Sequence, residues 1–163
     1  MSVDELHEYG LERMSDAEIR GFLAGQGLGV LALPTEGAPY VLPLSYDYDG
    51  ESRLYFTYLL GSESRKATLS EQTDEASFLV FSADSMFNWE SVMLTGTLRK
   101  PRPEEPTEPA EGVSRAWRPD VFQRADLSAG VEVYIFEITE QNGIRHTGLP
   151  PAFQPDAHAD REQ

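Results

Sequence analysis

The residues with the clearest chemical potential lie in the segment TYLLGSESRK, which spans residues 57–66. Arg65 and Lys66 are adjacent there, behind two serines. A guanidinium offers a planar fork of N–H donors and an ammonium offers a compact point charge, so both suit phosphate oxygens. Gly61 and the serines predict a turn that opens a short helix through Leu69, and a helix N-terminus presents free N–H groups. The pattern predicts an anion site, and the alternative is a solvated basic turn.

Overall charge makes these two cations conspicuous. The chain has 28 acidic and 13 basic residues, a net charge of -15, and Lys66 and Lys100 as its only lysines. Such a surface repels nucleic acid and anionic lipid, so neither is an expected partner. Acidity with few lysines also predicts a halophilic source, where salt screens self-repulsion; the alternative is an ordinary acidic soluble protein.

Length and composition predict one domain over residues 1–148 and a disordered tail over 149–163. A Pro- and Glu-rich stretch, PRPEEPTEPAEG (101–112), predicts an extended loop within that domain. The chain has no cysteine, which excludes disulfides and cysteine-ligated metals. Its acidic N-terminus lacks an apolar core, and no apolar run reaches membrane-spanning length, so we expect a cytoplasmic protein.

The hydrophobic pattern predicts a mainly β fold with short flanking helices. Ser15 and Glu18 form a capping-box pattern that begins a helix over about 15–25. Trp117 and Pro119 mark a further short helix near the PDVF sequence. Expected strands run over 28–33, 41–48, 53–58, 76–82, 90–99 and 131–139, with turns at 34–39 and 49–50. Six strands in meander-like order predict a small antiparallel barrel, closed or partly closed.

Pro43 interrupts the second expected strand. A proline within a strand indicates a sheet edge, a bulge or a backbone that a ligand approaches. Aromatic residues on strands more often fill the core than contact a ligand, so Tyr48 is assigned to the core. For Tyr46 both roles stay open. The histidines, His7, His146 and His158, are scattered, so we predict that they face solvent and that no metal site is present.

Three segments in this order resemble the pyridoxamine 5'-phosphate oxidase-like, FMN-binding split-barrel superfamily over about residues 15–140. They are GAPYVLPLSYDYDG (37–50), RLYFTYLLGSESRK (53–66) and NWESVMLTGTL (88–98). The resemblance implies a six-stranded antiparallel split β-barrel that binds FMN at a homodimer interface. It is nearest to the short branch that includes nitroimidazole-resistance-like flavoproteins.

The resemblance also implies the roles of individual residues. Arg65 and Lys66 would hold the FMN phosphate, with Ser64 and Thr57 as supporting donors and Phe56 beside Thr57 in the same strand. Residues of the Pro43 strand would run along the flavin ring, and Trp89 and Ser91 would cover it from the second subunit. The ring-side residues are Leu42, Pro43, Leu44, Ser45 and Tyr46.

Two departures from the family pattern limit the activity that the resemblance implies. The span from Thr57 to Arg65 is longer than in the oxidases. The C-terminal arginine-histidine motif that holds vitamin B6 has only an echo in Ile144-Arg145-His146, so pyridoxamine phosphate oxidation is not expected. We predict instead an FMN-dependent oxidoreductase that passes electrons from a reduced nicotinamide to a small organic acceptor. The alternatives are a deazaflavin-dependent reductase and a non-enzymatic flavin-binding or sensing protein.

Overall fold

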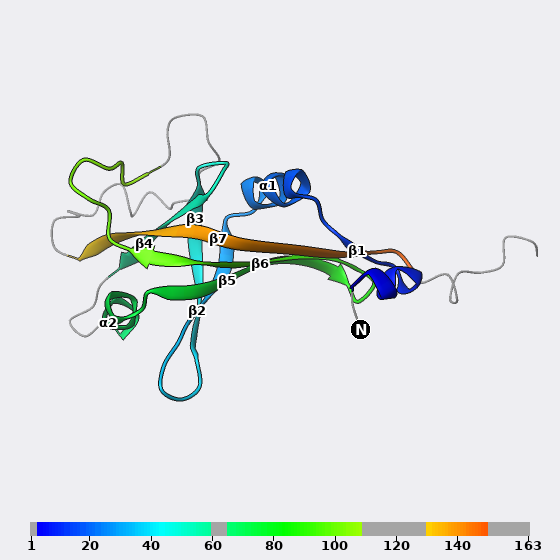
Figure 1. Ribbon diagram of the computed structural model, residues 1–163, viewed down its shortest axis with the longest axis horizontal. Coiled ribbons are helices and arrows are strands. Elements are labelled where there is room, and N and C mark those ends of the chain that lie inside the picture. Colours follow the sequence, from blue (N-terminus) through cyan, green and yellow to red (C-terminus); the bar gives the residue numbers. More distant parts are fainter. Residues whose placement is uncertain (1–2, 60–64, 109–129, 150–163) are drawn as a thin grey trace, which may run out of the picture.

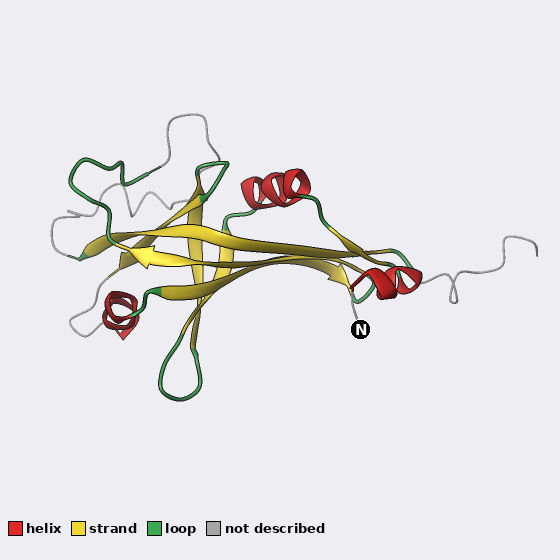
Figure 2. Cartoon of the chain, viewed as in Figure 1, coloured by secondary structure: helices red, strands yellow, loops and turns green. Residues whose placement is uncertain are grey.

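A computed structural model describes residues 3–59, 65–108 and 130–149 (Figure 1). The helices are a 3-10 helix η1 (Val3–Tyr9), α1 (Asp16–Gly25) and α2 (Arg65–Gln72). The strands are β1 (Leu11–Arg13), β2 (Leu28–Leu33), β3 (Tyr40–Tyr48), β4 (Arg53–Leu59), β5 (Glu75–Ser85), β6 (Asn88–Arg99) and β7 (Val131–Thr147). Strands dominate the described chain, and the helices lie at its periphery (Figure 2).

Six strands form a closed antiparallel barrel, which confirms the predicted fold class. The hydrogen-bonded order is β1-β7-β4-β3-β2-β5-β6, and β7 also pairs with β6 to close the ring. The ring therefore contains two three-stranded units, β2–β3–β4 and β5–β6–β7, which meet where β2 pairs with β5 and where β4 pairs with β7. Barrel closure pairs β6 with β7, which would otherwise be the two edge strands of an open six-stranded sheet.

Strand β7 is much longer than its predicted range of 131–139. Its first seven residues pair with β4, and its later residues pair with β6 and with the short strand β1. The second half of β7 thus continues past the barrel as a ribbon with β6 and the end of β5, toward β1 and η1 (Figure 1). Neither β1 nor this extension was predicted from the sequence.

Aromatic side chains fill the barrel interior. The Phe56 and Phe78 rings have centroids 4.9 Å apart, and Phe136 lies 5.8 Å from Phe56. Tyr46 meets Phe78 edge-on at 5.5 Å. All four residues are almost completely buried. Contacts of this kind add to the free energy gained by burying the rings, so they fix the barrel strands relative to one another.

Helix α1 forms where the sequence predicts a helix, and it packs against the barrel. Both bonds of the capping box are present: the Glu18 backbone N–H donates to Ser15 Oγ at 3.2 Å, and the Ser15 N–H donates to a Glu18 carboxylate oxygen at 2.7 Å. The buried face consists of Ile19, Phe22 and Leu23. The helix lies close to β7, where a Cβ built on Gly143 would approach Ile19 to 2.8 Å.

Some of the other predictions are confirmed, one is wrong, and some concern residues that the structure does not describe. The strand over 28–33 is confirmed, and the other strands match with shifted ends. The expectation that His146 faces solvent is wrong: only 8% of it is exposed, because it packs between Gly10, which follows η1, and Phe87 at the tip of the β5–β6 hairpin. Three predicted segments lie outside the described residues. They are the helix near Trp117, residues 109–112 of the Pro- and Glu-rich loop, and the tail after Leu149.

Candidate functional site

The barrel opens between β3 and β4. These strands pair only from Tyr46↔Phe56 to Tyr48↔Leu54. Beyond that point residues 40–45 pair with β2 alone, and residues 57–59 pair with β7 alone. No described strand therefore occupies the second edge of residues 40–45. Pro43 lies on this edge, where the missing N–H of a proline costs no hydrogen bond between strands. A sheet edge was one of the three predicted explanations for a proline at this position.

The N-terminus of α2 spans this opening. Arg65 is exposed and its guanidinium carbon lies 4.9 Å from the centroid of the Tyr40 ring, at the start of β3. Lys66 is half-buried and its Nζ lies 5.3 Å from the centroid of the Tyr58 ring, on β4. Both distances are within the range of cation–π attraction. The two predicted anion-binding cations thus each contact one of the diverging strands.

Arg65 and Lys66 form no ion pair with any carboxylate of the described residues. By contrast, Arg53, Arg99, Lys100 and Arg145 each lie within 4.0 Å of at least one carboxylate oxygen. In a chain with more than twice as many acidic as basic residues, two adjacent free cations form a local positive site in a negative field.

Tyr58 joins α2 to the barrel wall. Its hydroxyl lies 2.8 Å from Ser70 Oγ, on the same helix as Lys66. Its ring stacks on Tyr134 with centroids 4.5 Å apart. Burial raises the pKa of Tyr58 to about 12, against a smaller lowering by the Ser70 hydrogen bond, so the phenol is neutral at ordinary pH. A neutral ring attracts a cation without cancelling its charge.

The predicted ring-side residues alternate across β3. Pro43 and Ser45 face outward and are exposed, whereas Leu42 and Leu44 face the barrel interior. Tyr46 is 2% exposed, and its hydroxyl donates to the Leu23 carbonyl at 2.7 Å. Tyr46 is therefore a core residue, and its backbone N–H donates to the Gly27 carbonyl at 3.0 Å. Tyr48 is also buried, as predicted, and donates to the Glu51 carbonyl.

The other predicted residues fall into two groups. Thr57 is partly exposed on β4 near the opening, and its neighbour Phe56 is completely buried in the core. Trp89 and Ser91 lie on β6, where Trp89 is paired with His146 in the ribbon that extends beyond the barrel. That ribbon runs away from α2, so one chain does not bring Trp89 to the two cations (Figure 1). Ser64 lies outside the described residues.

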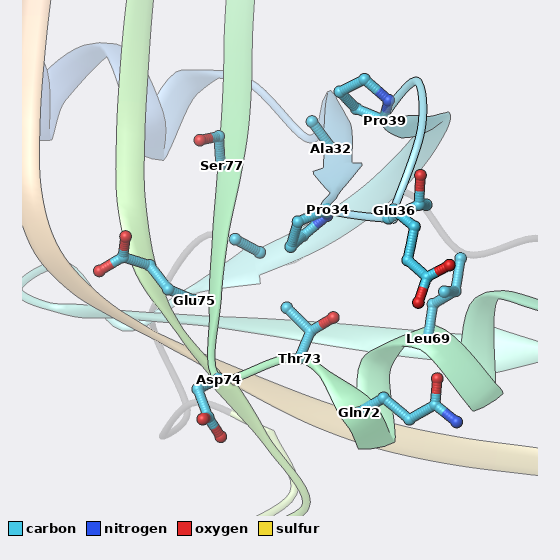
Figure 3. A pocket seen from close by; sticks show the side chains of 12 residues that line it. Ala32, Pro34, Glu36, Pro39, Leu69, Gln72, Thr73, Asp74, Glu75 and Ser77 are labelled. Carbon is cyan, nitrogen blue, oxygen red and sulfur yellow. The ribbon is translucent and has the colours of Figure 1, made fainter.

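Two hollows flank the hairpin that joins β2 to β3. The smaller, of about 630 Å³, includes Arg65 and Tyr40 in its lining. The larger, of about 830 Å³, lies between the hairpin, the end of α2 and the start of β5 (Figure 3). Thr35, Glu36 and Pro39 line both hollows, so the concave surface continues from Arg65 around the hairpin.

The described residues contain no group of three or more His, Cys, Asp or Glu side chains arranged to hold a metal ion. The helices of the described chain include none that is long and apolar enough to cross a membrane.

Sequence reasoning did not identify Tyr40 or Ser70 as part of this site. Ser70 follows Lys66 by four residues, so both lie on one face of α2, and that spacing was an available signal. Tyr40 has no comparable signal, because its contact with Arg65 depends on how β3 passes the start of α2.

Solved structures share this fold at low sequence identity. An FAD-binding protein from Mesorhizobium loti has 21% identity and a TM-score of 0.62, with 85% of this chain and 98% of that chain covered. An FAD-binding protein from Mycobacterium smegmatis has 16% identity and a TM-score of 0.60, with coverages of 84% and 99%. A candidate 5-nitroimidazole antibiotic resistance protein from Bacteroides thetaiotaomicron has 13% identity and a TM-score of 0.54, with coverages of 83% and 89%.

A search of the curated proteins found no match. The family model described as pyridoxamine 5'-phosphate oxidase matches residues 15–145, which include the whole barrel opening and both cations. The chain therefore belongs to the pyridoxamine 5'-phosphate oxidase family.

Proposed function

We propose that the protein is an FMN-binding oxidoreductase that transfers electrons from a reduced nicotinamide to a small organic acceptor. The observation that carries the proposal is the pair of cations at the opening between β3 and β4, Arg65 and Lys66, which have no carboxylate partner among the described residues. Family membership and the FAD-binding proteins of the same fold support a flavin as the ligand. The nitroimidazole-resistance-like branch remains the proposed position within the family.

The described residues fit the phosphate and the ring of FMN. Arg65 and Lys66 would bind the phosphate through charge-assisted hydrogen bonds, with Thr57 and Ser64 as further donors. Residues 41–46 would lie along the ring, and the backbone of Ser45 on the open edge is the proposed polar contact. The backbone groups of Leu42 and Leu44 lie on the side of the strand that pairs with β2, so these two residues would contact the ring without them. When bound, the flavin supplies the electron-transfer chemistry, and the protein supplies binding, orientation and local charge.

A homodimer is part of the proposal because one chain leaves an apolar face uncovered. Pro43, Val30, Leu79 and Met93 form a row across β3, β2, β5 and β6, as successive cross-strand pairs. Met93 is 45% exposed, and on the same strands Val41, Leu28 and Phe81 are each more than half exposed. Exposed apolar surface of this extent is typical of an interaction site. A second copy would cover it and could bring Trp89 and Ser91 to the opposite opening.

The dimer is tested by light scattering on the purified protein. We expect a dimer for the wild type and a monomer for Met93→Lys, because a lysine would have to be desolvated in the apolar row. Met86→Lys is the matched control, since Met86 is 77% exposed at the tip of the β5–β6 hairpin and outside the row. A monomeric wild type, or a dimeric Met93→Lys, would overturn this part of the proposal.

The oxidoreductase activity is tested by mixing the flavin-loaded protein with NADH or NADPH in the absence of oxygen. We expect the visible absorbance of the flavin to bleach and then to recover when a nitroaromatic acceptor is added. A flavin that binds but is not reduced by either nucleotide would support the non-enzymatic flavin-binding or sensing alternative. The anionic tail of a deazaflavin coenzyme would also suit Arg65 and Lys66, so the bound chromophore must be identified.

A further inference from the structure

We propose that Tyr40 and Tyr58 are positioning residues, whose ring faces hold Arg65 and Lys66 in place while leaving both charges free for an anion. We call these two rings the aromatic seats. The inference rests on the proposed function, because it concerns how the phosphate-binding cations are prepared for their ligand.

The first seat lies on the strand that borders the barrel opening. Tyr40 begins β3 and is half-buried, with its side chain packed against the core cluster. The guanidinium carbon of Arg65 lies 4.9 Å from its ring centroid. Arg65 itself is exposed, so without the ring its side chain would sample many rotamers. The ring restricts the guanidinium to the edge of the hollow that both residues line.

The second seat is fixed more firmly. Tyr58 is completely buried, its hydroxyl is 2.8 Å from Ser70 Oγ, and its ring stacks on Tyr134. Ser70 stands one helical turn after Lys66 on α2, so the same tyrosine contacts both residues. The hydroxyl therefore anchors the helix, and the ring face positions the ammonium that the helix carries.

Lys100 provides an internal comparison. Its Nζ lies 5.9 Å from the Tyr134 ring, on the other member of the stacked tyrosine pair. Unlike Lys66, it also contacts Glu71 at 2.8 Å and Glu132 at 3.2 Å. The two lysines of the chain thus contact the same tyrosine pair, but among the described residues carboxylates contact Lys100 and not Lys66. An ion pair and a ring both fix a lysine, but only the ring preserves its charge for another anion.

Preserved charge matters because a carboxylate partner would compete with the ligand. A phosphate binding to a paired cation must replace or share the existing partner, whereas a phosphate binding to a seated cation replaces only water. An aromatic ring attracts the cation through its quadrupole and carries no net charge. The seats therefore reduce the disorder of two long side chains without occupying the anion site, which is the usual advantage of preorganisation.

The test is a fluorescence titration of FMN into the dialysed, flavin-free protein. Tyr40→Leu removes the first seat and should raise the Kd of FMN by about 2- to 5-fold, as expected for one exposed cation–π contact. Tyr40→Phe keeps the ring and should bind FMN as the wild type does. Equal Kd values for Tyr40→Leu and the wild type would overturn the inference.

A double-mutant cycle shows whether Tyr40 acts through Arg65. In an Arg65→Ala background, Tyr40→Leu should leave the Kd of FMN unchanged, because the ring has no cation to hold. A purely structural effect of the leucine would persist in that background and would contradict the proposal. A wild type that does not bind FMN would overturn the proposed function and this inference together, so the two failures are distinguishable.

Tyr58 supplies an independent comparison of ring and hydroxyl. Tyr58→Phe removes the Ser70 hydrogen bond but keeps the face under Lys66, so thermal stability should fall while the Kd of FMN stays within about twofold of wild type. A Tyr58→Phe Kd that rises as far as that of Lys66→Ala would contradict the role of the ring. The Tyr40 series tests the inference even where a Tyr58 variant folds poorly, because Tyr40 is only half-buried.

Discussion

Replacement of both cations, Arg65→Ala with Lys66→Ala, should remove most of the affinity for a phosphate-bearing flavin. The two side chains carry no carboxylate partner in the described chain and are held by neutral rings. Their loss therefore leaves no buried carboxylate unpaired, and the fold should survive. The change in Kd then reports the lost interaction with the ligand rather than a general loss of structure.

The expected magnitude follows from the two hydrogen-bonding groups. A charge-assisted hydrogen bond contributes about 1.5–3 kcal/mol, and two would contribute about 3–6 kcal/mol. Arg65 is exposed, so water weakens its interaction and the lower end applies. About 3 kcal/mol corresponds to a Kd about 100-fold higher, since 1.4 kcal/mol is tenfold.

The assay is a titration of FMN into flavin-free protein at fixed ionic strength, together with thermal unfolding of each variant. Arg20→Ala with Arg102→Ala is the matched control, because it removes the same charge from two exposed residues outside the site. Screening limits long-range effects of those charges to about 10 Å at moderate salt. An Arg65→Ala/Lys66→Ala protein that binds FMN as tightly as the control would refute the assignment of the anion site.

Further expected outcomes concern stability. Gly96→Ala should lower the free energy of unfolding by about 3 kcal/mol in urea, because its Cβ would lie 2.3 Å from the Glu137 carbonyl oxygen, whereas Gly37→Ala has open space and should be neutral. A hydrogen bond from Arg99 lowers the pKa of Glu105 from 4.5 to about 2, so Glu105 stabilises the fold above pH 4.5 and loses that effect as the pH falls toward 2. Urea unfolding of Glu105→Gln should therefore show a deficit at pH 7 that disappears over this window, and a deficit that persists at pH 2 would contradict the ion pair. If the halophile prediction is right, molar KCl should raise the melting temperature of the wild type, and a fall would oppose it.

Local patterns in the sequence predicted the barrel strands well, because a buried strand has a short-range signature. The strand over 28–33 has the predicted bounds, and Ser15 and Glu18 form the predicted capping box. The end of β7 could not be predicted in the same way. Residues 140–147 include Glu140, Asn142 and Gly143, whose strand conformation depends on pairing with β6 and β1. The burial of His146 follows from that same long-range pairing.

The part of the candidate site that has a local sequence pattern was predictable, and the part that depends on long-range packing was not. Arg65 and Lys66 are adjacent in sequence and rare in an acidic chain, so they were identified directly. The divergence of β3 from β4 is a property of the closed barrel, and no local pattern specifies where two strands separate. Tyr40 contacts Arg65 from 25 positions away only because that opening brings the start of β3 to the start of α2.

Binding of a flavin phosphate at the barrel opening can be examined first on the protein as purified. We would record its visible absorption spectrum in high salt, release any bound small molecule by heat, and identify that molecule by chromatography and mass spectrometry. We expect a yellow protein that releases FMN. Released FAD or deazaflavin would correct the identity of the cofactor. A colourless protein that stays colourless and gains no absorbance on titration with FMN or FAD would contradict the claim.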